Sequence, residues 1–228
     1  MDKIEIDRLI ASRAQRLEHP EDIADILGSG FILAGGALSS DNLPKDFDIF
    51  RPEGIDISQM ECLLLSRCPQ WRTLSITRNA ITAEHCGQII QFCAYRKETP
   101  EKLIAAFDFS HCMAAAVFHR TGAIARTVYT DEFYLFLKYG FMQYTGSEYP
   151  LASLMRCAKF ISRGVIAKPE RWKPIILDII TDIVGRGFKD GEDFSDQCAS
   201  ISECFEVMNN SASDLFELLL RAKEGGQK

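Results

Sequence analysis

The chain has 228 residues, of which 46% are hydrophobic and 25% charged, and these globular values exclude a disordered, collagen-like or membrane-embedded chain. Its 32 acidic and 26 basic residues give a net charge of −6, which excludes a protein that coats nucleic acid over its whole surface. No apolar run reaches the ~18 residues of a membrane span, and no secretion signal is visible. Eight cysteines without a C-x-x-C pair indicate a reducing compartment, so we expect a cytoplasmic protein without disulfides, zinc ribbon or membrane contact.

The first half of the chain predicts two helices followed by a sheet. Apolar residues at helical spacing indicate a first helix around Ile6 to Leu17, and Pro20 and Gly28 begin and end a second. One helix is then expected over 57–68 and another after Thr99. Apolar or alternating runs between turn residues predict strands at 30–34, 47–50, 71–76, 80–83, 88–95 and 113–118. The first five form an expected sheet of about four or five strands, and the last is a further buried strand.

From about residue 130 onward the sequence predicts helices only. Thr130 is a suitable N-cap for a helix that Gly140 ends, and another helix is expected at 151–163. An acidic loop at 186–197 precedes two last helices. The predicted fold class is therefore α/β (α+β): a mixed sheet flanked by helices forms a head over 1–128, and a helical C-terminal region follows over 129–228.

The strongest functional signal is the segment 33–49, LAGGALSSDNLPKDFDI. Side chains at i and i+2 of a strand point to the same face, so Asp46 and Asp48 converge while Phe47 and Ile49 face the core. Carboxylate oxygens are the hard ligands that Mg²⁺ prefers, and two such ions about 3.5–4 Å apart can activate a hydroxyl and neutralise a leaving pyrophosphate. The spacing therefore predicts that Asp46 and Asp48 are catalytic metal ligands.

A glycine pair precedes these two acids by a short spacer. Gly35 and Gly36 have no Cβ atom, so backbone N–H groups can approach phosphate oxygens there. A helix starting at Ala37 would direct its positive end toward the same anion. Together the glycines and the acids predict a cradle for a nucleoside triphosphate beside a metal site.

Ala34-Gly35-Gly36 and Asp46-Phe47-Asp48-Ile49 resemble the signature of the polymerase-β-type nucleotidyltransferase superfamily. Within it, Lys45 to Ile49, Phe107 to Ser110 and the helix SLMRCAKFISRG look most like the head of CCA-adding enzymes and bacterial poly(A) polymerases. The resemblance implies an enzyme dependent on Mg²⁺ or Mn²⁺ that moves a nucleoside monophosphate from an NTP to an acceptor hydroxyl. It also implies that Lys45 joins the two glycines in contacting the nucleotide.

The chain departs from that head at several positions. The family has an arginine–aspartate pair after the glycines, where this chain has Ser39-Ser40-Asp41, and an arginine before the Asp-Phe segment, where it has Ala106-Phe107. These departures, together with a shorter chain, argue against CCA addition itself. A third carboxylate is expected on a neighbouring strand, and two positions compete. Asp108 has the required acid but follows a predicted helix, whereas Gln91 lies on the better strand but has an amide. The prediction favours Asp108 as the third catalytic metal ligand, and Gln91 as a contact either to the substrate or to a metal-binding side chain.

The acceptor is suggested by a local excess of positive charge. Residues 156–173 contain six basic residues and one acidic residue, and Arg156, Lys159 and Arg163 share one side of the predicted helix. This stripe is a candidate acceptor-binding surface for an RNA or tRNA 3′ end. Two alternatives remain: transfer to a protein side chain or small molecule, and a non-catalytic nucleotide-binding module of the same fold. The sequence indicates no oligomeric state.

Overall fold

A computed structural model of the chain describes residues 1–40, 44–68, 70–162 and 169–187. Its contacts divide the chain into two compact units, Met1–Gln143 and Tyr144–Lys228. The expected boundary after residue 128 lies before this division, so the helix that Thr130 caps belongs to the first unit. None of the helices in the described part of the chain combines the length and the apolar composition needed to cross a membrane.

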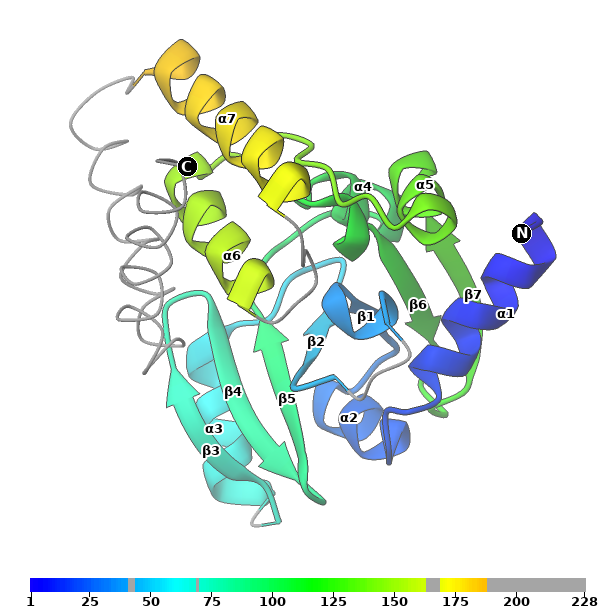
Figure 1. The fold of residues 1–228 in the computed structure, drawn as a ribbon. Helices are drawn as coiled ribbons and strands as arrows, with labels where there is room; N and C mark the ends of the chain where they lie inside the picture. The colour runs from blue at the N-terminus through cyan, green and yellow to red at the C-terminus, as the bar shows by residue number, and fades with distance from the viewer. Residues whose placement is uncertain (41–43, 69, 163–168, 188–228) are drawn as a thin grey trace. The chain divides into compact units, whose positions relative to one another are not determined.

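The first unit contains a seven-stranded mixed sheet with helices on both faces (Figure 1). In chain order its elements are α1 (Lys3–Ala14), α2 (Pro20–Leu27), β1 (Phe31–Ala34), the 3₁₀ helix η1 (Gly36–Leu38), β2 (Phe47–Phe50), α3 (Ile57–Arg67), β3 (Arg72–Ile76), β4 (Ala80–His85), β5 (Gln88–Cys93), α4 (Pro100–Ala105), the 3₁₀ helix η2 (Ser110–Cys112), β6 (Ala114–Phe118), β7 (Ile124–Tyr129) and α5 (Asp131–Tyr139). The α/β class is confirmed, and the sheet has more strands than predicted.

The sheet order is β3-β4-β5-β2-β1-β6-β7, and only the pair β2 and β5 is parallel among these neighbours. Strand β7, with the sequence IARTVY, was not predicted. It is an edge strand whose residues are half-buried or exposed, with Arg126 and Thr127 in its middle. A strand that packs on one side only lacks the apolar run on which the prediction relied.

The two faces of the sheet are covered to different extents. Leu33, Ile49 and Phe92 are fully buried in the main core, beneath α1, α2 and α3. On the other face, Leu103 and Ile104 of α4 pack with β1 and β6 residues such as Ala34. Helix α4 contacts β6 and β7, at one end of the strand order. On the same face, the in-register residues Asp48 of β2, Gln91 of β5 and Thr82 of β4 are polar, whereas Phe50 and Cys93 pack in the smaller cluster.

Local sequence signals explain where the helices begin and end. The Thr99 and Thr130 hydroxyls accept hydrogen bonds from the backbone N–H groups of Lys102 and Phe133, so both residues are N-caps as predicted. Gly28 and Gly140 end α2 and α5 with φ of 67°. These predictions succeeded because capping depends on a few adjacent residues.

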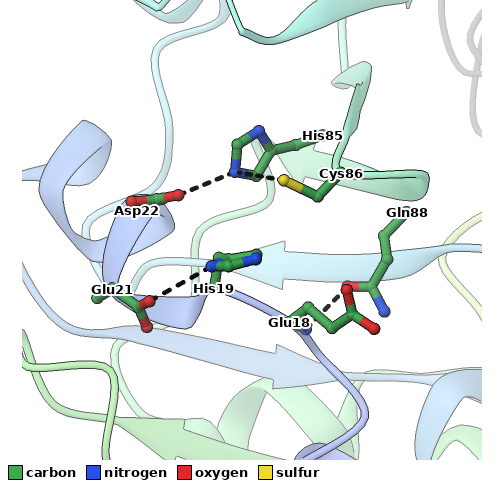
Figure 2. Close-up of polar contacts among 7 residues, drawn as sticks. All are labelled: Glu18, His19, Glu21, Asp22, His85, Cys86 and Gln88. Carbon is green, nitrogen blue, oxygen red and sulfur yellow. Dashed lines mark hydrogen bonds and ion pairs between the residues drawn. The ribbon is translucent and has the colours of Figure 1, made fainter.

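The β4–β5 hairpin is tied to the N-terminal helices by polar contacts (Figure 2). His85 is buried at the end of β4, and its Nε2 lies 2.9 Å from Asp22 Oδ2 on α2. Its ring also stacks on Trp71, with 4.3 Å between centroids. The backbone N–H of Glu18 donates to Gln88 Oε1 at 2.8 Å, which fixes the start of β5. The contacts therefore hold β5 in place beside β2.

The described part of the second unit consists of α6 (Pro150–Ser162) and α7 (Pro169–Arg186). The Tyr144 hydroxyl donates to Asp182 Oδ2 at 2.5 Å, and Arg186 donates to the carbonyls of Ser147 and Glu148 at 3.0 and 2.7 Å. Helix α6 spans nearly the predicted residues. Leu154, Ala158 and Ile161 are half-buried, whereas Ala152, Met155 and Cys157 are buried. Most of the acidic loop and the two last helices lie outside the described residues.

Candidate active site

The two aspartates of the sequence motif lie at the centre of the sheet. Asp48 is in β2, in register with Ala34 of β1 and Gln91 of β5. Its neighbours Phe47 and Ile49 are buried in the main core, so the half-buried Asp48 side chain points to the other face. Asp46 immediately precedes the strand and is also half-buried. The expected alternation between acids and core residues is therefore present at Asp48.

The glycine pair and the second aspartate meet directly. Gly35 has a φ of +87°, a conformation that residues with a Cβ rarely adopt, and a methyl group built there would lie 2.9 Å from Asp48 Oδ2. At Gly36 the same addition would meet open space. Only glycine at residue 35 thus lets the turn after β1 approach the Asp48 carboxylate without strain.

The turn after the glycines is shorter than predicted. Instead of a longer helix beginning at Ala37, the chain forms the single 3₁₀ turn η1. Two arginines of α1 bind its carbonyl groups: Arg13 donates to Leu38 at 2.9 Å, and Arg16 donates to Ala37 and Ser40 at 2.8 Å each. These hydrogen bonds give the last carbonyl groups of the short turn partners outside a helix.

The sequence analysis missed the role of Arg13 and Arg16. Arg13 is buried at the end of α1, and Arg16 is half-buried just after it. A buried arginine requires hydrogen-bond partners, so a basic residue three positions after the core residue Ile10 was the available signal. The carbonyls that they bind lie more than 20 residues away, at separations of 21 to 25 positions, which local patterns cannot reveal.

The two candidates for a third carboxylate differ in their place in the fold. Gln91 is in register with Asp48 on the parallel strand β5. Asp108 lies on no strand; it is buried in the segment between α4 and η2. Within the described residues, no group of three or more His, Cys, Asp or Glu side chains is arranged to hold a metal ion. Asp46, Asp48 and Asp108 are therefore not gathered into one three-carboxylate group.

The charge of the two aspartates reaches the neighbouring strand. The pKa of the Cys93 thiol on β5 is raised well above its usual value, first by burial and then by the negative charges of Asp48 and Asp46. Both carboxylates therefore act on the same side of β5. A pair of adjacent carboxylates with hard oxygen donors has the chemistry that fits a magnesium or manganese ion.

The remaining predicted site residues are more scattered. Lys45 is exposed directly before Asp46. Arg156 and Lys159 are half-buried on α6 in the second unit, and Arg156 Nη2 donates to Ser153 Oγ at 3.2 Å. Arg163 lies outside the described residues.

Comparisons with known proteins identify the fold. No protein-family model matches the sequence, and no curated protein matches it either. Among solved structures, a CCA-adding enzyme in complex with CTP has a TM-score of 0.52 and 13% identity, over 90% of this chain and 54% of that chain. The head of the molecule has the nucleotidyltransferase fold.

Two further structures of this kind are similar at slightly lower scores. A Thermotoga maritima CCA-adding enzyme complexed with tRNA has a TM-score of 0.49 and 13% identity, over 90% of this chain and 53% of its own. A tRNA nucleotidyltransferase complexed with a primer tRNA and an ATP analogue has a TM-score of 0.49 and 11% identity, over 71% of this chain and 50% of its own. The chain thus spans about half the length of these solved chains, and identities this low establish the fold alone.

Proposed function

We propose that the protein transfers a nucleoside monophosphate from an NTP to an acceptor hydroxyl. The observation that carries this proposal is the contact between the two halves of the motif, where Gly35 leaves room for Asp48 Oδ2. The fold alone does not require a glycine turn and a pair of carboxylates to approach each other this closely. Their meeting supports a site in which a triphosphate and metal ions are bound together.

Each group of residues has a separate role in the proposed site. Asp46 and Asp48 would hold Mg²⁺ or Mn²⁺, which supplies charge neutralisation for the triphosphate when bound. Gly35 and Gly36 admit phosphate oxygens to the backbone, and exposed Lys45 adds a positive charge beside the acids. Arg13 and Arg16 fix the turn by binding its carbonyls. Positioning and electrostatics, without a general acid, account for most of such a transfer.

We further propose an RNA 3′ end as the acceptor. The support is the basic stretch, of which Arg156 and Lys159 on α6 and Arg171 and Lys173 on α7 are in the described residues. Local positive charge in a chain of net charge −6 suits a polyanion. A protein side chain or a small molecule is the second candidate acceptor, favoured by the acidic chain as a whole.

A non-catalytic nucleotide-binding module is the alternative from another class. It is favoured by the register of β2 and β5, because Gln91 places a neutral amide beside Asp48. An amide lacks the charge of a carboxylate ligand, so this position adds nothing to the charge that would hold a second metal. Under this alternative the protein would bind NTP and Mg²⁺ without transferring nucleotide.

Labelled nucleotide transfer tests the proposal. The wild-type protein and Asp48→Asn are incubated with α-³²P-labelled NTPs, Mg²⁺ and either total RNA, cell protein or small molecules from a cell extract. We expect label in RNA with the wild type and none with Asp48→Asn, with thermal stability unchanged or slightly improved, because one of two repelling acids is removed. Label transfer at the wild-type rate by the variant contradicts the metal-ligand role. NTP binding without any labelled product selects the non-catalytic alternative.

A further inference from the structure

A row of polar side chains crosses the face of the sheet opposite the main core, starting at Asp48. Asp48 of β2 is in register with Gln91 of β5, Gln91 with Thr82 of β4, and Thr82 with Ser75 of β3. Residues in register on neighbouring strands point to the same side of a sheet. On the other side of β2, the row continues as Ala34 of β1, which belongs to the apolar cluster beneath α4. The row is therefore polar only from β2 toward β3.

Gln91 and Thr82 present hydrogen-bonding groups that the described residues of the chain do not use. Both residues are half-buried, and neither side chain makes a hydrogen bond in the part of the chain that the structure describes. The amide and the hydroxyl each provide a donor and an acceptor, and both are uncharged. The nearest charges in register on this hairpin, Arg72 and Glu84, bind each other. The surface beside Asp48 is therefore neutral and able to hydrogen-bond.

The two sides of Asp48 differ in what they can bind. Gly35 approaches the Asp48 carboxylate from the β1 side, where the proposed function places the triphosphate. In phosphoryl transfer the attacking and leaving oxygens lie roughly in line on opposite sides of the phosphorus. An acceptor hydroxyl therefore has to arrive from the β5 and β4 side. An anionic group is disfavoured there, because Asp46 and Asp48 already place negative charge beside β5.

We propose that Gln91 and Thr82 bind the terminal sugar of the acceptor through its hydroxyl groups, with Thr82 as a specificity-determining residue. This inference rests on the proposed function. In the reaction, one sugar hydroxyl oxygen bonds to the α-phosphorus, and the bond from that phosphorus to the β-phosphate oxygen breaks. Pyrophosphate leaves with the electron pair, and the hydroxyl proton passes to solvent. A terminal ribose has a second hydroxyl on the carbon next to the attacking one. This second hydroxyl is the group that hydrogen-bonds to Gln91 and Thr82.

Thr82→Val tests this role, because it removes a hydroxyl while keeping the shape and β propensity of the side chain. The matched control is Thr73→Val on β3, whose residue is in register with the core residue Ala83 and so lies on the other face. The acceptor probes are a short RNA ending in ribose, the same RNA ending in 2′-deoxyribose, and free adenosine with 2′-deoxyadenosine. The RNA pair and the nucleoside pair separate a polymer end from a small sugar acceptor.

We expect the wild type to show an acceptor KM about tenfold lower for the ribose-ended probe, as one hydrogen bond would give. Thr82→Val should lose this preference while keeping its kcat and its KM for NTP within about twofold, and Thr73→Val should keep the preference. If the wild type transfers nucleotide and Thr82→Val keeps the ribose preference, the inference is overturned. The proposed function is not contradicted by that result.

A binding measurement separates the two possible failures. If the wild type transfers no nucleotide to any acceptor, the proposed function fails, and NMR titration with the ribose-ended and deoxyribose-ended probes then decides the inference. Shifts of the Gln91 side-chain amide and the Thr82 backbone amide with the ribose-ended probe, larger than with the deoxyribose-ended one, support sugar binding. Equal or absent shifts overturn it.

Discussion

At the scale of single residues, Gly35 is the position on which both halves of the candidate site depend. Its positive φ and its closeness to Asp48 Oδ2 are independent reasons for a glycine. Replacement by alanine therefore adds backbone strain and also pushes a methyl group against a carboxylate. Gly36, one residue later, has open space at the same place and begins the 3₁₀ turn η1, which alanine tolerates.

We predict that Gly35→Ala lowers the free energy of unfolding by about 1–3 kcal/mol and abolishes nucleotide transfer. Gly36→Ala should change stability by less than ~1 kcal/mol. Urea denaturation of both variants beside the wild type measures the difference. Equal destabilisation by the two substitutions would show that the Asp48 contact does not constrain residue 35.

The third-carboxylate question is decided by a second pair of variants. If Asp108 is a ligand as the sequence suggested, Asp108→Asn should abolish transfer as Asp48→Asn does. Gln91→Ala should instead raise the KM of a substrate more than it lowers kcat, because a neutral contact contributes binding. Steady-state kinetics of both variants, with their thermal stability as control, measures this. A large loss of kcat in Gln91→Ala with normal kcat in Asp108→Asn would reverse the two assignments.

At the scale of elements, the sequence predicted those that rest on local chemistry. The caps at Thr99 and Thr130 and the strands on either side of the glycine turn required only a few adjacent residues. Strand β7 was missed because an edge strand needs no apolar run. The partnership of Gln91 with Asp48 depends on which strands become neighbours, and sequence spacing does not specify that order.

The 3₁₀ helix η2 contains a titratable group whose environment has a measurable consequence. His111 is buried there, and its ring lies 5.8 Å from that of Phe136 on α5. Burial lowers the pKa of His111 from 6.5 to about 3. The imidazole is therefore neutral in the folded protein at pH values where the unfolded chain already binds a proton.

This difference predicts a loss of stability in acid. Between pH 6.5 and 3 the unfolded state holds the extra proton, so the free energy of unfolding falls as the pH is lowered. His111→Gln, which has no titrating group, should lose about 1.6 kcal/mol less than the wild type between pH 6.5 and 5, at a maximum of about 1.4 kcal/mol per pH unit. Urea unfolding of both proteins at a series of pH values measures the difference between their free energies of unfolding. The contribution of the carboxylates cancels in this difference, because both proteins contain them. Parallel curves would contradict a neutral buried His111.

At the scale of the whole molecule, positive charge is concentrated locally in a chain whose net charge is −6. Asp46 and Asp48 lie in the first unit, and the described helices of the second unit carry Arg156, Lys159, Arg171 and Lys173. A polyanionic acceptor that reached the carboxylates would need such positive charge elsewhere in the chain. The sequence predicts both the basic stretch and its role in binding an acceptor, and that role stays a prediction, because a solvated helix face has the same pattern.

Replacing Arg156, Lys159 and Arg163 together by glutamine tests that role. Helix propensity and NTP binding should be unchanged, whereas RNA binding should weaken. The slope of log affinity against log salt should shrink by up to about three units if all three side chains meet phosphates. A salt titration of RNA binding, wild type beside the triple variant, measures it. An unchanged slope rejects the RNA contact and favours a protein or small-molecule acceptor.

The position of Arg16 changes where the structural unit that holds the candidate site begins. Its guanidinium binds the carbonyls of Ala37 and Ser40 in the turn after Gly35, and its own carbonyl accepts a hydrogen bond from Gln88 Nε2 at 2.7 Å. One residue thus braces the glycine turn and strand β5 at once. A search pattern drawn from the glycines and aspartates would start the unit near residue 30. The structural unit starts at α1. A fragment cut between α1 and residue 30 would therefore retain the glycines and the aspartates but lose Arg16, which links the glycine turn to strand β5.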